Sequence, residues 1–147
     1  MIFALLYNLP SQNTRDAQHW ATRHKETKRV QNLVTYSAHR LPRASGPRCL
    51  HVMSYRKQRI TDHANLAGGA KGLVDAIVRA GLLVDDKDVM ARITYGQAVL
   101  SQMPDALVEQ WGRRPLTVIT LTDGIPEAGR EPRVITEQEA RSLGVIP

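Results

Sequence analysis

The chain has one cysteine, few aromatic residues and no long apolar run. With Cys49 as its only cysteine it cannot form an internal disulfide, which favours a reducing compartment such as the cytoplasm. The opening run MIFALLY is too short to span a bilayer and lacks the basic start and cleavage site of a secretory signal. We therefore expect a cytoplasmic protein without membrane contact, in which Cys49 is a packed or exposed thiol rather than a nucleophile.

Acidic residues are scarce in the first part of the chain. Residues 1–59 contain eleven Lys/Arg and two Asp/Glu, a net charge of +9, whereas residues 60–147 contain nine and twelve, a net charge of −3. A basic part followed by an acidic part is expected where one region binds a polyanion and another binds cations. We expect a nucleic-acid partner; a solvated basic helix without a partner is the alternative.

Apolar periodicity and turn residues predict one α+β domain over residues 1–147, with a mixed β-sheet covered by helices. Asn13 or Thr14 is expected to cap the first helix, and Gly81 to end the second. The polar segment with Pro104 and Trp111 reads as an insert. Strands are predicted at 2–7, 49–55, 89–95 and 116–122, and helices at 15–39, at 66–80 and after a capping box at Thr136–Glu139.

The first predicted helix is mostly polar and has the basic centre ATRHKETKR. We expect one of its faces to pack and the other to present cations to solvent or to phosphate. A second basic cluster, RKQR, directly precedes Asp62. The candidate DNA-binding residues are Asn13, Arg15, Arg23, Lys25, Lys28, Arg29, Arg56, Lys57 and Arg59.

Carboxylates flank the second predicted helix, in the segment DHANLAGGAKGLVDAIVRAGLLVDDKD. Asp62 precedes the helix, and Asp85 and Asp86 follow it. Phosphodiester cleavage by water adds negative charge to an anionic group, and Mg²⁺ held by one or two carboxylates offsets that charge. A helix of fifteen residues is about 22 Å long, so a shared ion requires a strand that returns beside the one leading to Asp62. The candidate metal ligands are Asp62, Asp85 and Asp86.

Lys71 lies on the same helix between these acidic points. It can stabilise charge on a scissile phosphate, or pair with Asp75 four residues later. Gly68 and Gly69 weaken the helix start, which indicates either close approach of another backbone or a bend. His63 is expected to be an ordinary surface residue, because the histidines lack metal-ligand spacing.

Three pieces of this pattern resemble the RusA family of Holliday-junction resolvases, which is common in phages and prophages. LPSQN followed by TRDAQHWATRHKETKR is similar to the Pro/Asn turn and basic, Trp-bearing helix of that family. Asp62-x-Ala64-Asn65-Leu66 is similar to its Asp-x-Asp-Asn-Leu. The spacing from Lys71 through Asp75 to Asp85-Asp86 fits its lysine-to-double-aspartate spacing. The resemblance covers about residues 2–97 and little of residues 98–147.

The resemblance implies a homodimer that uses Mg²⁺ to nick a four-way DNA junction in recombination and repair, in the cytoplasm of a bacterial or phage-infected cell. It makes Asp62 and Asp86 metal-binding catalytic residues, Lys71 the catalytic lysine and Asp85 a neighbouring acidic residue. The chain departs from the family in two ways: Lys71 lies about three residues further from Asp62, and Ala64 replaces the second motif aspartate. The alternative is therefore a weakened or inactive DNA-binding protein of the same fold.

Overall fold

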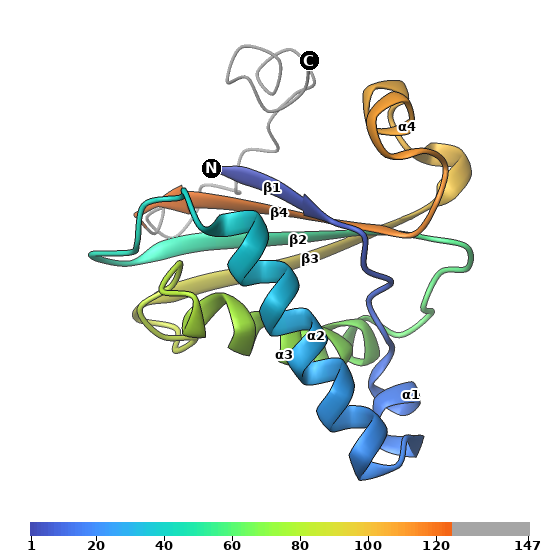
Figure 1. Cartoon of the computed structure of the whole chain (residues 1–147), viewed down its shortest axis with the longest axis horizontal. Coiled ribbons are helices and arrows are strands. Elements are labelled where there is room, and N and C mark those ends of the chain that lie inside the picture. Colours follow the sequence, from blue (N-terminus) through green and yellow to red (C-terminus); the bar gives the residue numbers. More distant parts are fainter. Residues whose placement is uncertain (125–147) are drawn as a thin grey trace.

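The backbone of residues 1–124, which the computed structural model describes, forms a four-stranded sheet with the long helices against one face and a short helix on the other (Figure 1). The strand order is β1-β4-β2-β3, and β4 is antiparallel to both of its neighbours. Strands β2 and β3 are parallel. The predicted α+β class with a mixed sheet is confirmed. The strands are β1 (Ile2–Leu5), β2 (Arg48–Arg56), β3 (Ala91–Val99) and β4 (Leu116–Asp123).

Two helices replace the single helix predicted over residues 15–39, so that prediction is wrong. The chain is extended at Gln18, and the His19 side chain then accepts a hydrogen bond from the amide of Ala21 and caps a new helix. The cap of the first helix is Ser11 rather than Asn13 or Thr14. The helices are α1 (Gln12–Ala17), α2 (Trp20–Ala38), α3 (His63–Arg79) and α4 (Asp105–Trp111), with a 3₁₀ turn, η1 (Leu100–Gln102).

Helix α4 lies within the segment that was predicted to be a polar insert. The sequence does not predict this helix, because its seven residues are too few for a clear apolar period. The prediction for Gly81 is confirmed: its φ of 75° stops α3 at a position where residues with a Cβ are strained. The capping box at Thr136–Glu139 lies outside the described residues. None of the helices in residues 1–124 is long and apolar enough to cross a membrane.

The main core lies between the sheet and helices α2 and α3. Leu50, Val52 and Ser54 of β2 alternate onto this face and are fully buried, as their spacing in the sequence predicts. Helix α3 buries Leu73 and Ile77 against them, one helical turn apart. A smaller cluster around Met103 and Leu116 packs beneath α4. The opposite faces of α2 and α3 remain open to solvent.

Helix α3 connects the two parallel strands β2 and β3. Parallel neighbours need a long crossover, and α3 with its flanking loops provides it. All nine residues of β2 pair in register with β3, from Arg48 opposite Ala91 to Arg56 opposite Val99. Strand β3 does lie beside β2, but the two run in the same direction, so the loop with Asp85 and Asp86 meets the start of β2 rather than the end that leads to Asp62. The strand running back toward Asp62 that a shared ion requires is therefore not formed in residues 1–124.

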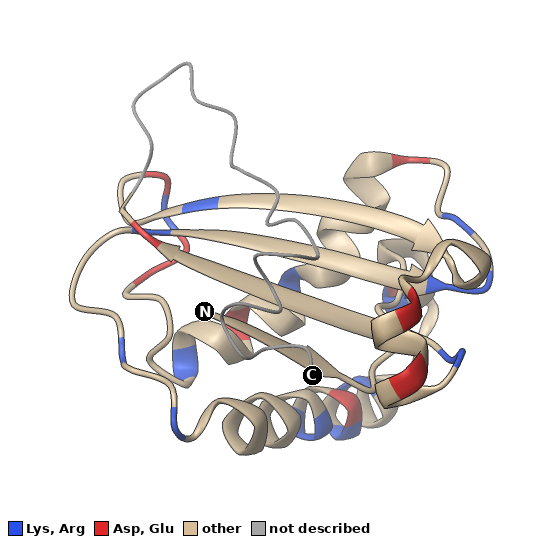
Figure 2. Ribbon diagram, turned by 90° about the horizontal axis from the view of Figure 1, so that it is seen from above, with Lys and Arg blue, Asp and Glu red and all other residues tan. Residues whose placement is uncertain are grey.

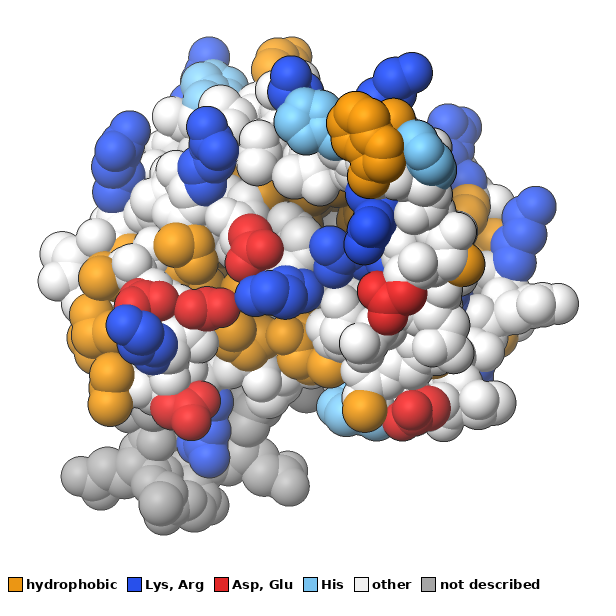
Figure 3. Space-filling model, turned by 90° about the horizontal axis from the view of Figure 1, so that it is seen from below, with side chains coloured by type: hydrophobic (Ala, Val, Ile, Leu, Met, Phe, Trp, Pro, Cys, Tyr) orange, Lys and Arg blue, Asp and Glu red, His pale blue; other side chains and the backbone are white. Residues whose placement is uncertain are grey.

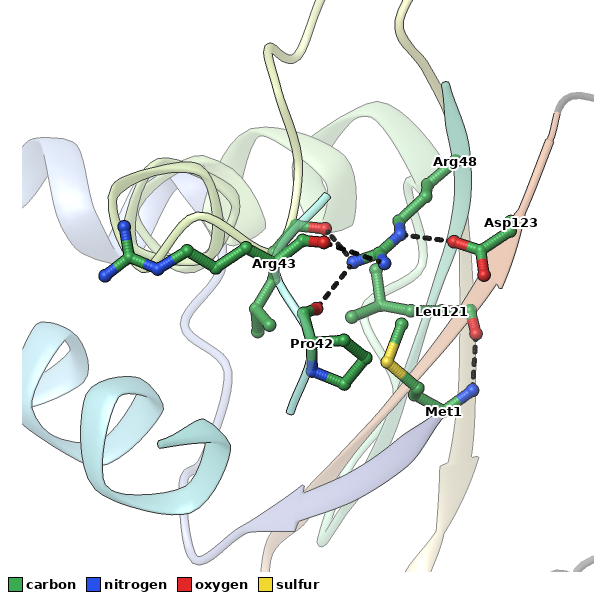
Figure 4. Close-up of polar contacts among 7 residues, drawn as sticks. Met1, Pro42, Arg43, Arg48, Leu121 and Asp123 are labelled. Atoms are coloured by element: carbon green, nitrogen blue, oxygen red, sulfur yellow. Dashed lines mark hydrogen bonds and ion pairs between the residues drawn. The ribbon is translucent and has the colours of Figure 1, made fainter. Parts of the chain in front are cut away.

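Arg48 hydrogen-bonds to the loops near the start of these strands (Figure 4). Its guanidinium is almost fully buried and donates hydrogen bonds to the carbonyls of Pro42, Arg43 and Leu82. Its Nε lies 2.6 Å from Oδ1 of Asp123 at the end of β4. A buried cation with this many acceptors is fully paired, so Arg48 is a structural residue that sets where the chain enters β3.

Candidate metal and nucleic-acid site

Asp62 is the N-cap of α3. Its backbone is extended, and its Oδ1 accepts a hydrogen bond from the amide of Ala64 at 3.0 Å. The side chains of Asp62 and Ala64 are exposed at this helix start. The carboxylate thus satisfies one of the free amides of the first turn, a stabilising role that does not require a metal.

Asp85 and Asp86 lie together in the loop between α3 and β3. Oδ1 of Asp85 accepts a hydrogen bond from the amide of Asp86 at 2.8 Å, and Oδ2 lies 3.3 Å from Nζ of Lys87. The Lys87 ammonium and the Asp86 amide hold the pKa of Asp85 below its ordinary value. Asp85 is thus anionic at neutral pH, and no cation lies within 4 Å of the exposed Asp86 carboxylate in residues 1–124.

Tyr95 of β3 lies beside the start of α3. Its ring centroid lies 6.3 Å from that of His63 in an edge-on arrangement, next to the Asp62 cap. Burial raises the pKa of Tyr95, and the negative charge of Asp86 raises it further. Sequence patterns do not single out this tyrosine, because it has the features of an ordinary strand residue. His63 is exposed, as expected of a surface residue, and its ring meets Tyr95 edge-on.

The structure brings Asp85 and Asp86 together but leaves Asp62 apart from them. Asp62 and the double aspartate are at opposite ends of the seventeen-residue α3, which is about 25 Å long. Within residues 1–124, no three His, Cys, Asp or Glu side chains form a group that could hold a metal ion. The segment before Asp62 is tied to β3, because Ile60 and the side chain of Gln97 exchange two hydrogen bonds.

Lys71 forms an ion pair with Asp75, with Nζ and Oδ1 3.6 Å apart. Both side chains are more than half exposed, so the pair contributes only tenths of a kcal/mol and leaves Lys71 free to move. The structural alternative for Lys71 is thus observed.

Figure 3 shows acidic side chains in a band across the face that carries the helices, with basic and histidine side chains along the rim above it.

The two glycines in the first turns of α3 let α1 and its preceding turn lie against the helix. A Cβ at Gly69 would be 1.8 Å from the carbonyl oxygen of Pro10, and one at Gly68 would meet the Gln12 side chain. The amide of Asn13 also donates to Oδ1 of Asn65 at 3.1 Å. Close backbone approach, rather than a bend, is therefore the reason for the glycines. It joins the LPSQN turn to the Asp62 motif.

The nine candidate DNA-binding residues fall into two groups. Arg15, Arg56 and Arg59 donate hydrogen bonds to the carbonyls of Gly68, Leu9 and Gln97, so part of their function is structural. Burial lowers the pKa of Arg56. Asn13 binds Asn65 through its backbone. The exposed cations without such ties are Arg23, Lys25, Lys28 and Lys57, and Arg29, which pairs with Glu26 at 3.6 Å. In Figure 2, basic segments recur along α2 with one acidic segment among them.

The chain matches no protein-family model, and no curated protein matches it. The likeness to the RusA family therefore depends on the motifs in Asp62–Asp86 and on the basic helix alone.

Proposed function

We propose that this protein is a Mg²⁺-dependent endonuclease of the RusA type that nicks four-way DNA junctions as a homodimer. The observation that supports this best is the position of α2 beside α3. Helix α2 carries exposed cations, and α3 is flanked by the acidic unit, so a bound DNA backbone would lie next to the carboxylates. A two-fold symmetric junction suits a two-fold dimer, because each protomer then cuts one strand.

The donor set of the loop fits Mg²⁺ in part. Mg²⁺ prefers one or two carboxylates, with water and substrate oxygens completing its shell. Asp86 would hold the ion, with Asp85 beside it, whereas Asp62, at the other end of the rigid helix α3, would not share that ion within one protomer. When bound, the ion would polarise a phosphoryl oxygen. Lys71 would then leave Asp75 and stabilise the charge that develops on the phosphate.

The alternative is a DNA-binding protein of the same fold that does not cleave. Ala64 is the residue that favours it, since it supplies no carboxylate where the RusA motif has one. An aspartate at this exposed position in the first turn of α3 would be compatible with the fold, and the helix dipole would stabilise it by about 0.3–1 kcal/mol.

A cleavage assay on a synthetic four-way junction, with and without Mg²⁺, separates the two. We expect paired nicks by the natural chain with Mg²⁺ and none by Asp86→Asn. Asp105→Asn, an exposed aspartate on α4, is the matched control and should cut normally. A junction that is bound but never nicked, together with activity gained by Ala64→Asp, would rule out the enzyme and favour the alternative.

Binding of Mg²⁺ can be measured without cleavage. A ligand that binds only the native state raises the unfolding temperature, so Mg²⁺ should stabilise the natural chain but not Asp86→Asn. Asp62→Asn is the informative second variant, because asparagine caps a helix as well as aspartate does. If Asp62→Asn keeps the stability but loses the Mg²⁺ effect, Asp62 is a ligand. If it keeps both, Asp62 is only a cap. Light scattering tests the dimer.

A further inference from the structure

One face of α2 combines cations with an exposed aromatic ring. Lys25, Lys28, Arg29, Asn32, Leu33 and Tyr36 line an open groove of about 560 Å³. Their spacing of three and four residues places them in one stripe along the helix, about 16 Å long from Lys25 to Tyr36. The buried residues Val30, Val34 and Ala38 occupy the opposite face. The stripe is thus the side of α2 that no helix or strand of residues 1–124 covers.

Tyr36 is not a core residue. It is 80 % exposed, and its ring stands 6.1 Å from that of His39, tilted by 34°. An exposed tyrosine at the end of a cationic groove loses contact with water over a large apolar area when a flat partner stacks on it. The exposed Tyr36 ring is therefore available for such stacking.

The charges of the groove select an anionic partner. No carboxylate lies within 4 Å of Lys25 or Lys28 in residues 1–124, and Arg29 meets only Glu26. Three cations followed by an aromatic ring, on one straight line, match a nucleic-acid strand in which phosphates are followed by an unpaired base. A duplex would offer the phosphates but keeps its bases stacked inside.

We infer that this groove binds single-stranded DNA, with the backbone on Lys25, Lys28 and Arg29 and an unpaired base stacked on Tyr36. The inference rests on the nucleic-acid binding in the proposed function but not on cleavage. It assigns to α2 a preference for unpaired strands, such as those exposed where a branched DNA opens. Asn32, between the cations and the ring, is placed to hydrogen-bond to the edge of a base.

The test compares a fluorescein-labelled oligothymidylate with a duplex of equal length by fluorescence anisotropy. Stacking of one base on an aromatic side chain changes affinity by roughly five- to a hundredfold on alanine substitution. We therefore expect Tyr36→Ala to weaken oligothymidylate binding by that factor and duplex binding less than twofold. Tyr36→Phe should bind as the natural chain does. Trp20→Ala is the matched control, because Trp20 is also exposed on α2 but lies outside the groove.

The cations give a second readout. For single strands, each phosphate contact changes the slope of log affinity against log salt by about 0.7, so replacing Lys25 and Lys28 by alanine should reduce it by about 1.4. Three outcomes would overturn the assignment of Tyr36 without affecting the proposed function. They are unchanged oligothymidylate binding by Tyr36→Ala, equal losses on both probes, and an equal loss in Trp20→Ala. Failure of the natural chain to bind any DNA would overturn the proposed function as well.

Discussion

Replacing Gly69 by alanine tests the contact that joins the N-terminal turn to α3. The added Cβ would lie 1.8 Å from the carbonyl oxygen of Pro10, whereas real Cβ contacts do not fall below 3.0 Å. The Pro10 backbone must therefore move by at least about 1.2 Å. It follows Leu9, which is buried and whose carbonyl accepts a hydrogen bond from Arg56 at 3.0 Å, so it cannot move alone.

The two energy contributions have opposite signs. Alanine improves helix propensity by about 1 kcal/mol over glycine, and overpacking of this kind costs about 1–3 kcal/mol. We expect Gly69→Ala to lower the free energy of unfolding by up to about 2 kcal/mol. The matched variant is Gly72→Ala on the same helix, where the nearest atom is 3.5 Å away on the Arg15 side chain. That variant should gain up to about 1 kcal/mol.

Urea unfolding followed by circular dichroism measures both variants. The two should differ by the overpacking cost, about 1–3 kcal/mol, with the midpoint of Gly69→Ala below that of the natural chain and the midpoint of Gly72→Ala above it. If Gly69→Ala were as stable as Gly72→Ala, the LPSQN turn would not be docked on α3, and the reason given for the glycine pair would be wrong.

Three further predictions concern ionisable groups. Arg48→Met should lower the free energy of unfolding by about 3 kcal/mol, because it leaves buried carbonyls unpaired. Asp123→Asn should lower it by less than about 1 kcal/mol, because the Asp123 side chain is 79 % exposed. Urea unfolding measures both. Burial raises the pKa of Tyr7 to about 12, so this tyrosine ionises at a lower pH in the unfolded chain than in the folded one. The free energy of unfolding should therefore fall between pH 10 and 12, by about 1 kcal/mol at pH 11. Tyr7→Phe should abolish this loss. The depressed pKa of Asp85 stabilises the fold above the unfolded pKa of this group, and the stabilisation is lost as the pH falls through the folded pKa. Lys87→Ala should raise the folded pKa of Asp85 in an NMR titration. An unchanged pKa would mean that the ion pair does not form in solution.

The strands and α3 could be predicted from the sequence because their apolar residues recur at regular intervals. Leu50, Val52 and Ser54 alternate onto the buried face, and Gly81 ends α3 as its left-handed φ requires. The break between α1 and α2 could not be predicted, because it depends on the His19 side chain capping its own helix rather than on a proline or glycine. Helix α4 was missed because its helical period is too short to stand out.

The candidate site could be predicted residue by residue but not in three dimensions. Spacing identified the carboxylates, yet only the parallel pairing of β2 and β3 shows that Asp62 and Asp86 are at opposite ends of a crossover. Tyr95 has no local signature, because its position beside the start of α3 comes from long-range packing with His63. The same is true of Tyr36, whose exposure depends on which face of α2 the sheet covers.

The capping role of Asp62 changes which residue is the best evidence for a metal. An aspartate at a helix start is explained by the amide of Ala64 alone, so its presence would be expected in a protein that binds no ion. Asp86 has no such explanation: it is exposed, no cation lies within 4 Å of it in residues 1–124, and its charge perturbs Tyr95 rather than stabilising a turn. A cation bound at Asp86 would also interact with the anionic Asp85 beside it. Asp86 therefore supports the metal hypothesis more strongly than Asp62 does.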